Sequence, residues 1–193
     1  MTLSLIPVDR EPAAAAVLLT GIPGSGKSTV AGALAARLRM SARVEVDALQ
    51  DMIVNGGQWP SPAANPEADR QIFLRARNAC LLADSFARAG FVPVLDDVVV
   101  RRSHLDFYRT TLTAVPLHVV VLAPGPEVAW QRNQAREKAL AVDWSPLDGA
   151  MRSEIGQEGT WIDNAGQTVE ETVEAILAAT GLVSGPGIGD DRP

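Results

Sequence analysis

The sequence predicts an α/β domain built on a parallel β-sheet with helices on both faces. Two observations carry this prediction. Short apolar, β-branched runs alternate along the chain with stretches of helical periodicity, and no internal repeat interrupts the alternation. Ligands of such sheets bind at the carboxyl ends of the strands, so polar residues that follow apolar strands are the first candidates for a functional site.

The N-terminal third of the chain predicts two strands and two helices. The apolar run Ala16–Leu19 indicates a buried strand, and the periodic segment Val30–Leu38 indicates the helix after it. Arg43–Asp47 predicts a second strand that ends in a carboxylate, followed by a short helix over Ala48–Val54. Asn55–Pro66 is rich in glycine and proline, which break regular structure, and is therefore expected to be a loop.

The remaining elements continue the alternation. Glu67–Ala89 predicts a long helix that Gly90 ends in a left-handed conformation. Phe91–Asp97 predicts a strand, with Pro93 tolerated near its start. The later elements are expected over Ser103–Leu112 (helix), Leu117–Leu122 (strand), Glu127–Leu140 and Trp144–Glu154 (helices), Thr160–Asp163 (strand), and a last helix to about Thr180 that opens with a Thr168/Glu171 capping box.

A phosphate-binding loop follows the first strand. Gly21–Ser28 matches the pattern G-x-x-x-x-G-K-S/T at every fixed position. Glycine lets the backbone fold tightly around an anion, and the N-terminus of the next helix adds a favourable field. Lys27 would reach the β- and γ-phosphates, and the Ser28 hydroxyl would bind Mg²⁺. The predicted nucleotide-binding residues are Gly21, Ile22, Pro23, Gly24, Ser25, Gly26, Lys27, Ser28 and Thr29.

Carboxylates that follow the second and third strands are the candidates for catalysis and metal binding. Asp47 is the candidate general base that would deprotonate an acceptor hydroxyl, and helix capping is its alternative role. Asp96 is the candidate Mg²⁺ ligand. Asp97 is assigned to acceptor or structural contacts, because adjacent strand residues face opposite ways.

Two arginines follow the fourth strand at a spacing that places them on one helical face. Arg132 would flank the base of the nucleotide, and Arg136 would stabilise charge on the transferred phosphoryl group. An ordinary solvated basic face is the alternative. Asn164, after the last strand, is a further candidate for the adenine pocket. An acceptor pocket is expected under the loop Asn55–Pro66, with candidate lining residues Asp51, Trp59, Arg70, Phe73, Arg75 and Arg77.

Composition excludes several classes of function. The net charge of -6 and pI near 4.9 argue against general nucleic-acid or membrane-surface binding. Cys80 is the only cysteine, so no intrachain disulfide forms, and His104 and His118 match no metal-binding pattern. Charged residues near the N-terminus are atypical of a signal peptide, which predicts a cytoplasmic protein. We expect a flexible lead (1–12), one domain (13–183) and a disordered tail (184–193).

Together these motifs resemble the small P-loop kinases, and most of all the chloramphenicol phosphotransferase-like family. The resemblance rests on Thr20–Thr29, Val44–Asp47, Val94–Val98 and the pair Arg132 and Arg136. It implies a P-loop NTPase three-layer sandwich, with a five-stranded parallel sheet in the order 2-3-1-4-5 and a helical lid. It also implies that Asp47 activates the acceptor hydroxyl.

Three functions remain open at this point. The first is an ATP- and Mg²⁺-dependent phosphotransferase acting on a hydroxyl of a small molecule, with antibiotics among the candidate acceptors. The second is a kinase for nucleotide sugars, as in zeta-type toxins, or for a polynucleotide 5′-hydroxyl. The third is an ATP-binding regulatory module that acts through a protein partner. ATP is expected rather than GTP, because the guanine-reading pattern Asn-Lys-x-Asp is absent.

Overall fold

The computed structural model describes residues 11, 13–61, 63–135 and 142–185. Its sheet contains five strands, all parallel, in the order β2-β3-β1-β4-β5. The predicted fold class and strand order are therefore confirmed. The strands are β1 (Ala16–Thr20), β2 (Ser41–Glu45), β3 (Val92–Asp96), β4 (Leu117–Leu122) and β5 (Thr160–Ile162).

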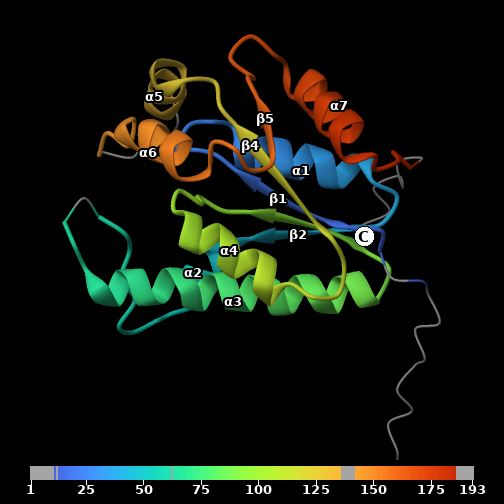
Figure 1. Cartoon of the computed structure of the whole chain (residues 1–193), viewed down its shortest axis with the longest axis horizontal. Coiled ribbons are helices and arrows are strands. Elements are labelled where there is room, and N and C mark those ends of the chain that lie inside the picture. The colour runs from blue at the N-terminus through green and yellow to red at the C-terminus, as the bar shows by residue number, and fades with distance from the viewer. Residues whose placement is uncertain (1–10, 12, 62, 136–141, 186–193) are drawn as a thin grey trace, which may run out of the picture.

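Helices cover both faces of the sheet, as Figure 1 shows. Successive residues of β1 serve opposite faces. Val17 and Leu19 pack with α1 (Lys27–Arg37) and α7 (Val169–Thr180), whereas Ala16 and Leu18 belong to the cluster on the other face. That second cluster takes residues from α2 (Val46–Asp51), α3 (Pro66–Arg88), α4 (Arg102–Thr111), α5 (Pro126–Gln134) and α6 (Pro146–Ile155).

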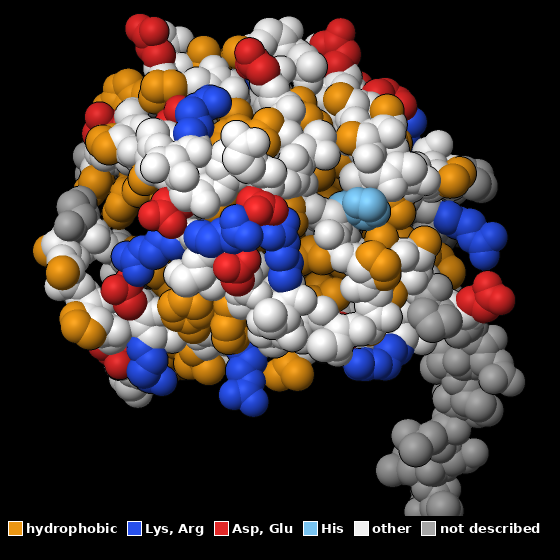
Figure 2. Space-filling view, viewed as in Figure 1, with side chains coloured by type: hydrophobic (Ala, Val, Ile, Leu, Met, Phe, Trp, Pro, Cys, Tyr) orange, Lys and Arg blue, Asp and Glu red, His pale blue; other side chains and the backbone are white. Residues whose placement is uncertain are grey.

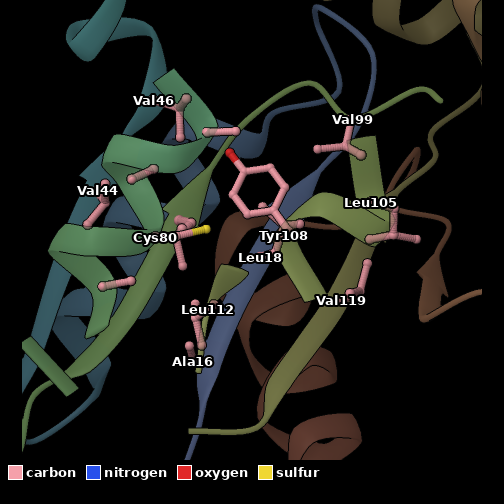
Figure 3. Packing of buried hydrophobic residues seen from close by; sticks show 14 of the residues in the cluster. Ala16, Leu18, Val44, Val46, Cys80, Val99, Leu105, Tyr108, Leu112 and Val119 are labelled. Atoms are coloured by element: carbon pink, nitrogen blue, oxygen red, sulfur yellow. The ribbon is translucent and has the colours of Figure 1, made fainter. Parts of the chain in front are cut away.

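Tyr108 lies in the middle of this second cluster. Figure 3 shows its ring among side chains from the sheet and the surrounding helices, including Leu18, Cys80 and Leu105. The ring is completely buried, so its hydroxyl needs a partner inside the protein. That partner is the carboxylate of Asp97. The hydrophobic core therefore continues directly into a polar cluster at the carboxyl end of β3.

Predicted local signals are confirmed at two helix ends. The Thr168/Glu171 capping box opens α7, and Gly90 after α3 has a left-handed φ of 84°.

Exposed ion pairs join α4 to the loop before β5: Arg102 and Arg109 both contact Glu158. Basic and acidic side chains lie interspersed on the face seen in Figure 2. No helix in the described part of the chain is both long and apolar enough to cross a membrane.

The structure differs from the predicted elements in two places and describes only part of a third. β2 ends at Glu45, so Asp47 lies in the first turn of α2 and does not end a strand. α5 ends at Gln134, and residues 136–140 of the helix predicted there lie outside the described residues. Ser184, assigned to the tail, forms an antiparallel bridge with Leu38, and the Gly185 N–H donates to the carbonyl of Arg37 (3.0 Å).

Candidate active site

The phosphate-binding loop links β1 to α1, as its motif requires. α1 begins at Lys27, directly after Gly26, so the positive end of the helix dipole faces the loop. Gly24 and Gly26 have φ values of 89° and 92°, a backbone conformation that residues with a Cβ rarely adopt. At Gly24 space is also lacking, because a Cβ there would overlap the carbonyl oxygen of Ala129 in α5. This glycine therefore allows the loop and α5 to approach closely.

Gly24→Ala should abolish nucleotide binding and lower the stability of the fold. The added methyl group forces the loop away from α5 and strains its backbone, so the inward N–H groups lose their arrangement. Calorimetric titration with an ATP analogue and a thermal melt measure the two effects. Gly149→Ala in α6 is the matched control, because a Cβ there meets nothing within 4 Å. An alanine variant at Gly24 that binds nucleotide normally would contradict the assigned role of the close approach.

Buried polar atoms without partners surround the loop. Among the described residues, Ser25 Oγ, Asp96 Oδ1 and Asn164 Oδ1 are buried and have no hydrogen-bond partner. Buried polar groups are normally satisfied, so three such atoms at one edge of the sheet indicate a site built for a ligand. Asn164 also donates from Nδ2 to the carbonyl of Ser25 (3.0 Å). This hydrogen bond holds the loop after β5 against the phosphate-binding loop. Asn164 thus lies where the sequence analysis expects a nucleotide contact.

The residues at the end of β3 fit a magnesium site. The strand register places Asp96 beside Leu19 of β1, one residue before the end of the strand that enters the loop. Arg43 holds Asp96 Oδ2 at 3.2 Å, which leaves Oδ1 for another ligand. The described residues contain no cluster of three or more acidic, His or Cys side chains that could hold a metal alone. Mg²⁺ suits such a site, because it is commonly held by one or two protein groups, phosphate oxygens and water.

The two candidate arginines after β4 have different outcomes. Arg132 donates from Nη2 to the carbonyls of Asn164 (2.9 Å) and Ala165 (3.1 Å), so it holds α5 to the loop after β5. The structure thus brings two predicted nucleotide-side residues together. Arg136 lies outside the described residues, so its role as a charge stabiliser stays a prediction.

Asp47 projects from α2 into a cavity and pairs with a buried arginine. Its Oδ1 lies 3.3 Å from Nη1 of Arg75, and 49% of its side chain is exposed. Glu45 is the N-cap of α2 and no side chain caps the helix, so the alternative capping role of Asp47 is wrong. Burial raises the pKa of Asp47, while the charges of Arg75 and Lys27 oppose that shift. A carboxylate with a raised pKa is a better proton acceptor than one in water.

The cavity beside Asp47 has a volume of about 620 Å³. It reaches the phosphate-binding loop at Pro23, and most of its other walls are apolar. Three of the predicted acceptor-side residues line it, namely Trp59, Phe73 and Arg75. The other three do not: Asp51 and Arg77 are exposed, and Arg70 pairs with Glu67 at 2.7 Å on the surface of α3. Further lining residues are Ile72, Val98, Val100, Trp144 and Leu147.

The basic side chains that line this cavity each lie beside a carboxylate. Arg101 Nη1 lies 3.2 Å from Asp69 Oδ1, and His104 Nε2 lies 3.3 Å from Asp97 Oδ2. The sequence analysis assigned none of Asp69, Arg101 and His104 to the site. A signal for His104 exists in the chain, because His104, Leu105 and Tyr108 share the buried face of α4.

The side chain of Gln71 binds the backbone of the loop between α2 and α3. Gln71 Oε1 accepts from Gln50 Nε2 and from the Gln58 N–H, each at 2.7 Å. Its Nε2 donates to the carbonyl of Gly56 (2.8 Å) and to Glu67 (2.7 Å). A loop rich in glycine and proline is expected to be free to close over an acceptor. Instead, two hydrogen bonds between the buried Gln71 amide and the backbone of Gly56 and Gln58 hold the middle of the loop against α3.

Gln71→Leu should release this loop. The change removes all four bonds and leaves the buried Gln50 amide without its closest partner, at a cost of roughly 1–3 kcal/mol. We expect faster amide hydrogen exchange at residues 53–58, together with a lower melting temperature. Asn78→Leu, an exposed amide on the same helix, is the control. If exchange at residues 53–58 is equal in the two variants, the loop is held by something other than Gln71.

Comparisons with known proteins agree with this fold. The family model AAA_33, described as an AAA domain, matches residues 17–152. Among curated protein sequences, none matches the chain. Several solved structures do, at identities that establish the fold only.

Three of these structures cover 89% of this chain. A sugar kinase from Janibacter sp. HTCC2649 has a TM-score of 0.64 and 21% identity, with 96% of that chain covered. The tunicamycin resistance protein of Deinococcus radiodurans has a TM-score of 0.65 and 21% identity, with 99% covered. The APS kinase CysC of Mycobacterium tuberculosis, in complex with AMPPNP and APS, has a TM-score of 0.61 and 18% identity, with 99% covered.

The family match spans most of the domain, from β1 and the phosphate-binding loop through α5 and into α6. It includes the cavity residues from Asp47 to Leu147. On the strength of that match, and of a fold shared with small-molecule kinases, the chain belongs to the AAA_33 family of AAA domains.

Proposed function

We propose that this protein is an ATP- and Mg²⁺-dependent phosphotransferase that moves the γ-phosphate to a hydroxyl group of a small molecule. One observation carries the proposal: the cavity that contains the Asp47 carboxylate also reaches the phosphate-binding loop at Pro23. A donor site and a potential acceptor site therefore adjoin each other. Two of the structural neighbours are a sugar kinase and an APS kinase, the latter with bound AMPPNP, and they support the same reaction class. A cytoplasmic location, where ATP is available, fits this function.

The residues of the chain divide the reaction between them. Lys27 and the loop N–H groups would hold the phosphates, while Ser28 and Asp96 would hold Mg²⁺, which neutralises charge on the phosphates when bound. Asp47 would orient the acceptor hydroxyl and accept its proton. The acceptor oxygen then forms a bond to the γ-phosphorus as the bond from that phosphorus to the bridging oxygen of ADP breaks. Arg136 is proposed to stabilise charge on the transferred group.

The cavity lining favours an uncharged acceptor with an apolar body. Among the described residues that line the cavity, the guanidinium groups of Arg75 and Arg101 each lie beside a carboxylate, as does the His104 imidazole, so no unpaired basic group is left there to attract an anionic acceptor. Aromatic and aliphatic side chains form most of the remaining wall. These features support a hydroxylated antibiotic of the kind suggested by the resemblance to chloramphenicol phosphotransferases. They count against nucleotide sugars and polynucleotide 5′-ends, which carry phosphate groups.

A screen for acceptor-dependent ADP release tests the proposal. Hydroxylated antibiotics, nucleosides, sugars, nucleotide sugars and 5′-hydroxyl oligonucleotides are each offered with ATP and Mg²⁺. Lys27→Ala is assayed in parallel to measure contaminating kinase activity. We expect release with one or more uncharged apolar alcohols and none with the phosphorylated acceptors. Turnover confined to phosphorylated acceptors, or ATP-dependent capture of a protein without any turnover, would replace the proposal with one of its alternatives.

A further inference from the structure

A single buried arginine connects the candidate base to the end of β3. Arg75 comes from α3, and only 5% of its side chain is exposed. Its Nη1 lies 3.3 Å from Oδ1 of Asp47, and its Nη2 lies 3.3 Å from Oδ1 of Asp97. The two ends of one planar guanidinium thus contact carboxylates from two different elements. Arginine suits this task because its nitrogens form a rigid fork.

Asp97 is itself held from several directions. Its side chain is fully buried, and it accepts hydrogen bonds from the Tyr108 hydroxyl and the Val98 N–H, both at 2.8 Å. His104 Nε2 lies 3.3 Å from the same carboxylate. Because Tyr108 and His104 both belong to α4, the position of Asp97 is fixed by the core and not by solvent. Arg75 therefore has a rigid anchor on the side away from Asp47.

The same arrangement leaves one oxygen of Asp47 available. Arg75 Nη1 lies beside Oδ1, and no described residue donates a hydrogen bond to Oδ2. The Trp59 ring lies against the guanidinium, with its centroid 5.7 Å from the Arg75 Cζ, and also lines the cavity. This contact further restricts where Arg75 can move.

We propose that Arg75 is a positioning residue for the phosphoryl transfer: anchored on Asp97, it holds Oδ1 of Asp47 so that the other oxygen serves the acceptor hydroxyl. The inference rests on the proposed function, because it assigns Arg75 a part in the same reaction. The anchor follows β3, Arg75 lies on α3 and the base lies on α2, so the guanidinium also fixes α2 relative to the sheet.

The charge of Arg75 has a second consequence for Asp47. The charged groups that influence this carboxylate are Arg75 on α3, Lys27 on α1, and Asp96 and Asp97 at the end of β3. Burial and the two aspartates raise its pKa, whereas the two cations lower it. Removal of Arg75 leaves Lys27 as the remaining cation among these groups. The pKa of Asp47 then rises, and the acid limb of the activity profile moves to higher pH.

Arg75→Met and Arg75→Lys test the inference. For Arg75→Met we expect kcat to fall about 100-fold, the KM for ATP to stay unchanged, and the acid limb of kcat to move up by about 1 pH unit. Arg75→Lys keeps the positive charge but cannot contact both carboxylates. The acid limb of its kcat profile should therefore lie at the wild-type pH, whereas its kcat should stay reduced. Arg77→Met, an exposed arginine on the same helix, should match the wild type.

A carboxyl ¹³C titration of Asp47 separates this inference from the proposed function. Its signal is assigned by its loss in Asp47→Asn, and the titration needs no acceptor. An unchanged Asp47 titration in Arg75→Met, or kcat within threefold of the wild type in both variants, overturns the role of Arg75. If Arg75→Met does not fold, the kcat of Arg75→Lys decides in the same way. Wild-type protein that transfers phosphate to no acceptor overturns the proposed function, and a raised Asp47 titration then still supports the coupling to Arg75.

Discussion

Asp47→Asn is expected to lower kcat by roughly 10²- to 10⁴-fold while ATP affinity stays close to that of the wild type. The asparagine amide matches the carboxylate in shape but cannot accept the acceptor proton in the transition state. The proposed nucleotide contacts come from the phosphate-binding loop, Asp96 and the loop after β5, none of which depends on Asp47. Steady-state kinetics with the acceptor found in the screen, and calorimetric titration with an ATP analogue, measure the two quantities.

The control for this variant is Asp51→Asn, on the same short helix. Asp51 is exposed and does not line the cavity, so its variant should keep full turnover. The wild-type enzyme should also lose activity as the pH falls through the pKa of Asp47, which lies above the ordinary value of 3.8. If Asp47→Asn turned over at a near wild-type rate, the base would have to be sought elsewhere in the cavity.

Local sequence patterns predicted the strand, loop and helix around the phosphate-binding motif well, because these parts are adjacent in the chain. A buried strand, a glycine loop and a helix occupy fewer than thirty consecutive positions, and each carries its own signal. The error at Asp47 is also local in origin. Val46 is apolar and β-branched, so it extends the strand pattern of Arg43–Glu45, whereas in the structure it is the first residue of α2 and packs into the core.

The cavity beside Asp47 could not be predicted to the same depth, because the contacts around it join elements that are distant in the sequence. Asp47, Arg75, Asp97 and His104 come from α2, α3, the end of β3 and α4, and only the packing of these elements brings them together. A signal for Arg75 nevertheless exists in the sequence. It shares the buried stripe of α3 with Gln71, Ala79 and Ala83, where a charged residue needs a partner.

The attachment of the loop Asn55–Pro66 to α3 could not be predicted for a related reason. Glycine and proline in Asn55–Pro66 correctly indicated a loop, but they say nothing of what holds it. Its attachment depends on the side chain of Gln71, which lies beyond the loop in the first half of α3. Composition thus predicted the absence of regular structure and overestimated the freedom of the segment.

Asp97→Asn should destabilise the fold by about 3 kcal/mol or more, although the substitution changes no side-chain volume appreciably. Burial alone would raise the pKa of Asp97, but His104, Arg75 and Tyr108 outweigh it and lower that pKa to about 2. An uncharged amide removes the charge that these groups surround and presents an N–H₂ group to donors. The buried guanidinium of Arg75 then retains only Asp47, which is half exposed. Chemical denaturation at neutral pH measures the loss.

The pH dependence of stability provides an independent check on the same carboxylate. Because the pKa of Asp97 is lower in the folded protein than its ordinary 3.8, the stabilisation is fully present above about pH 4 and disappears as the pH falls towards 2. The difference corresponds to roughly 2 kcal/mol, which Asp97→Asn should lack at every pH. Its free energy of unfolding should therefore fall less steeply than that of the wild type between pH 4 and 2.

Glu174→Gln, which breaks the exposed pair with Arg37, should keep both the wild-type stability at neutral pH and the wild-type acid slope. A neutral-pH stability for Asp97→Asn equal to that of Glu174→Gln would show that the buried cluster does not depend on the charge of Asp97.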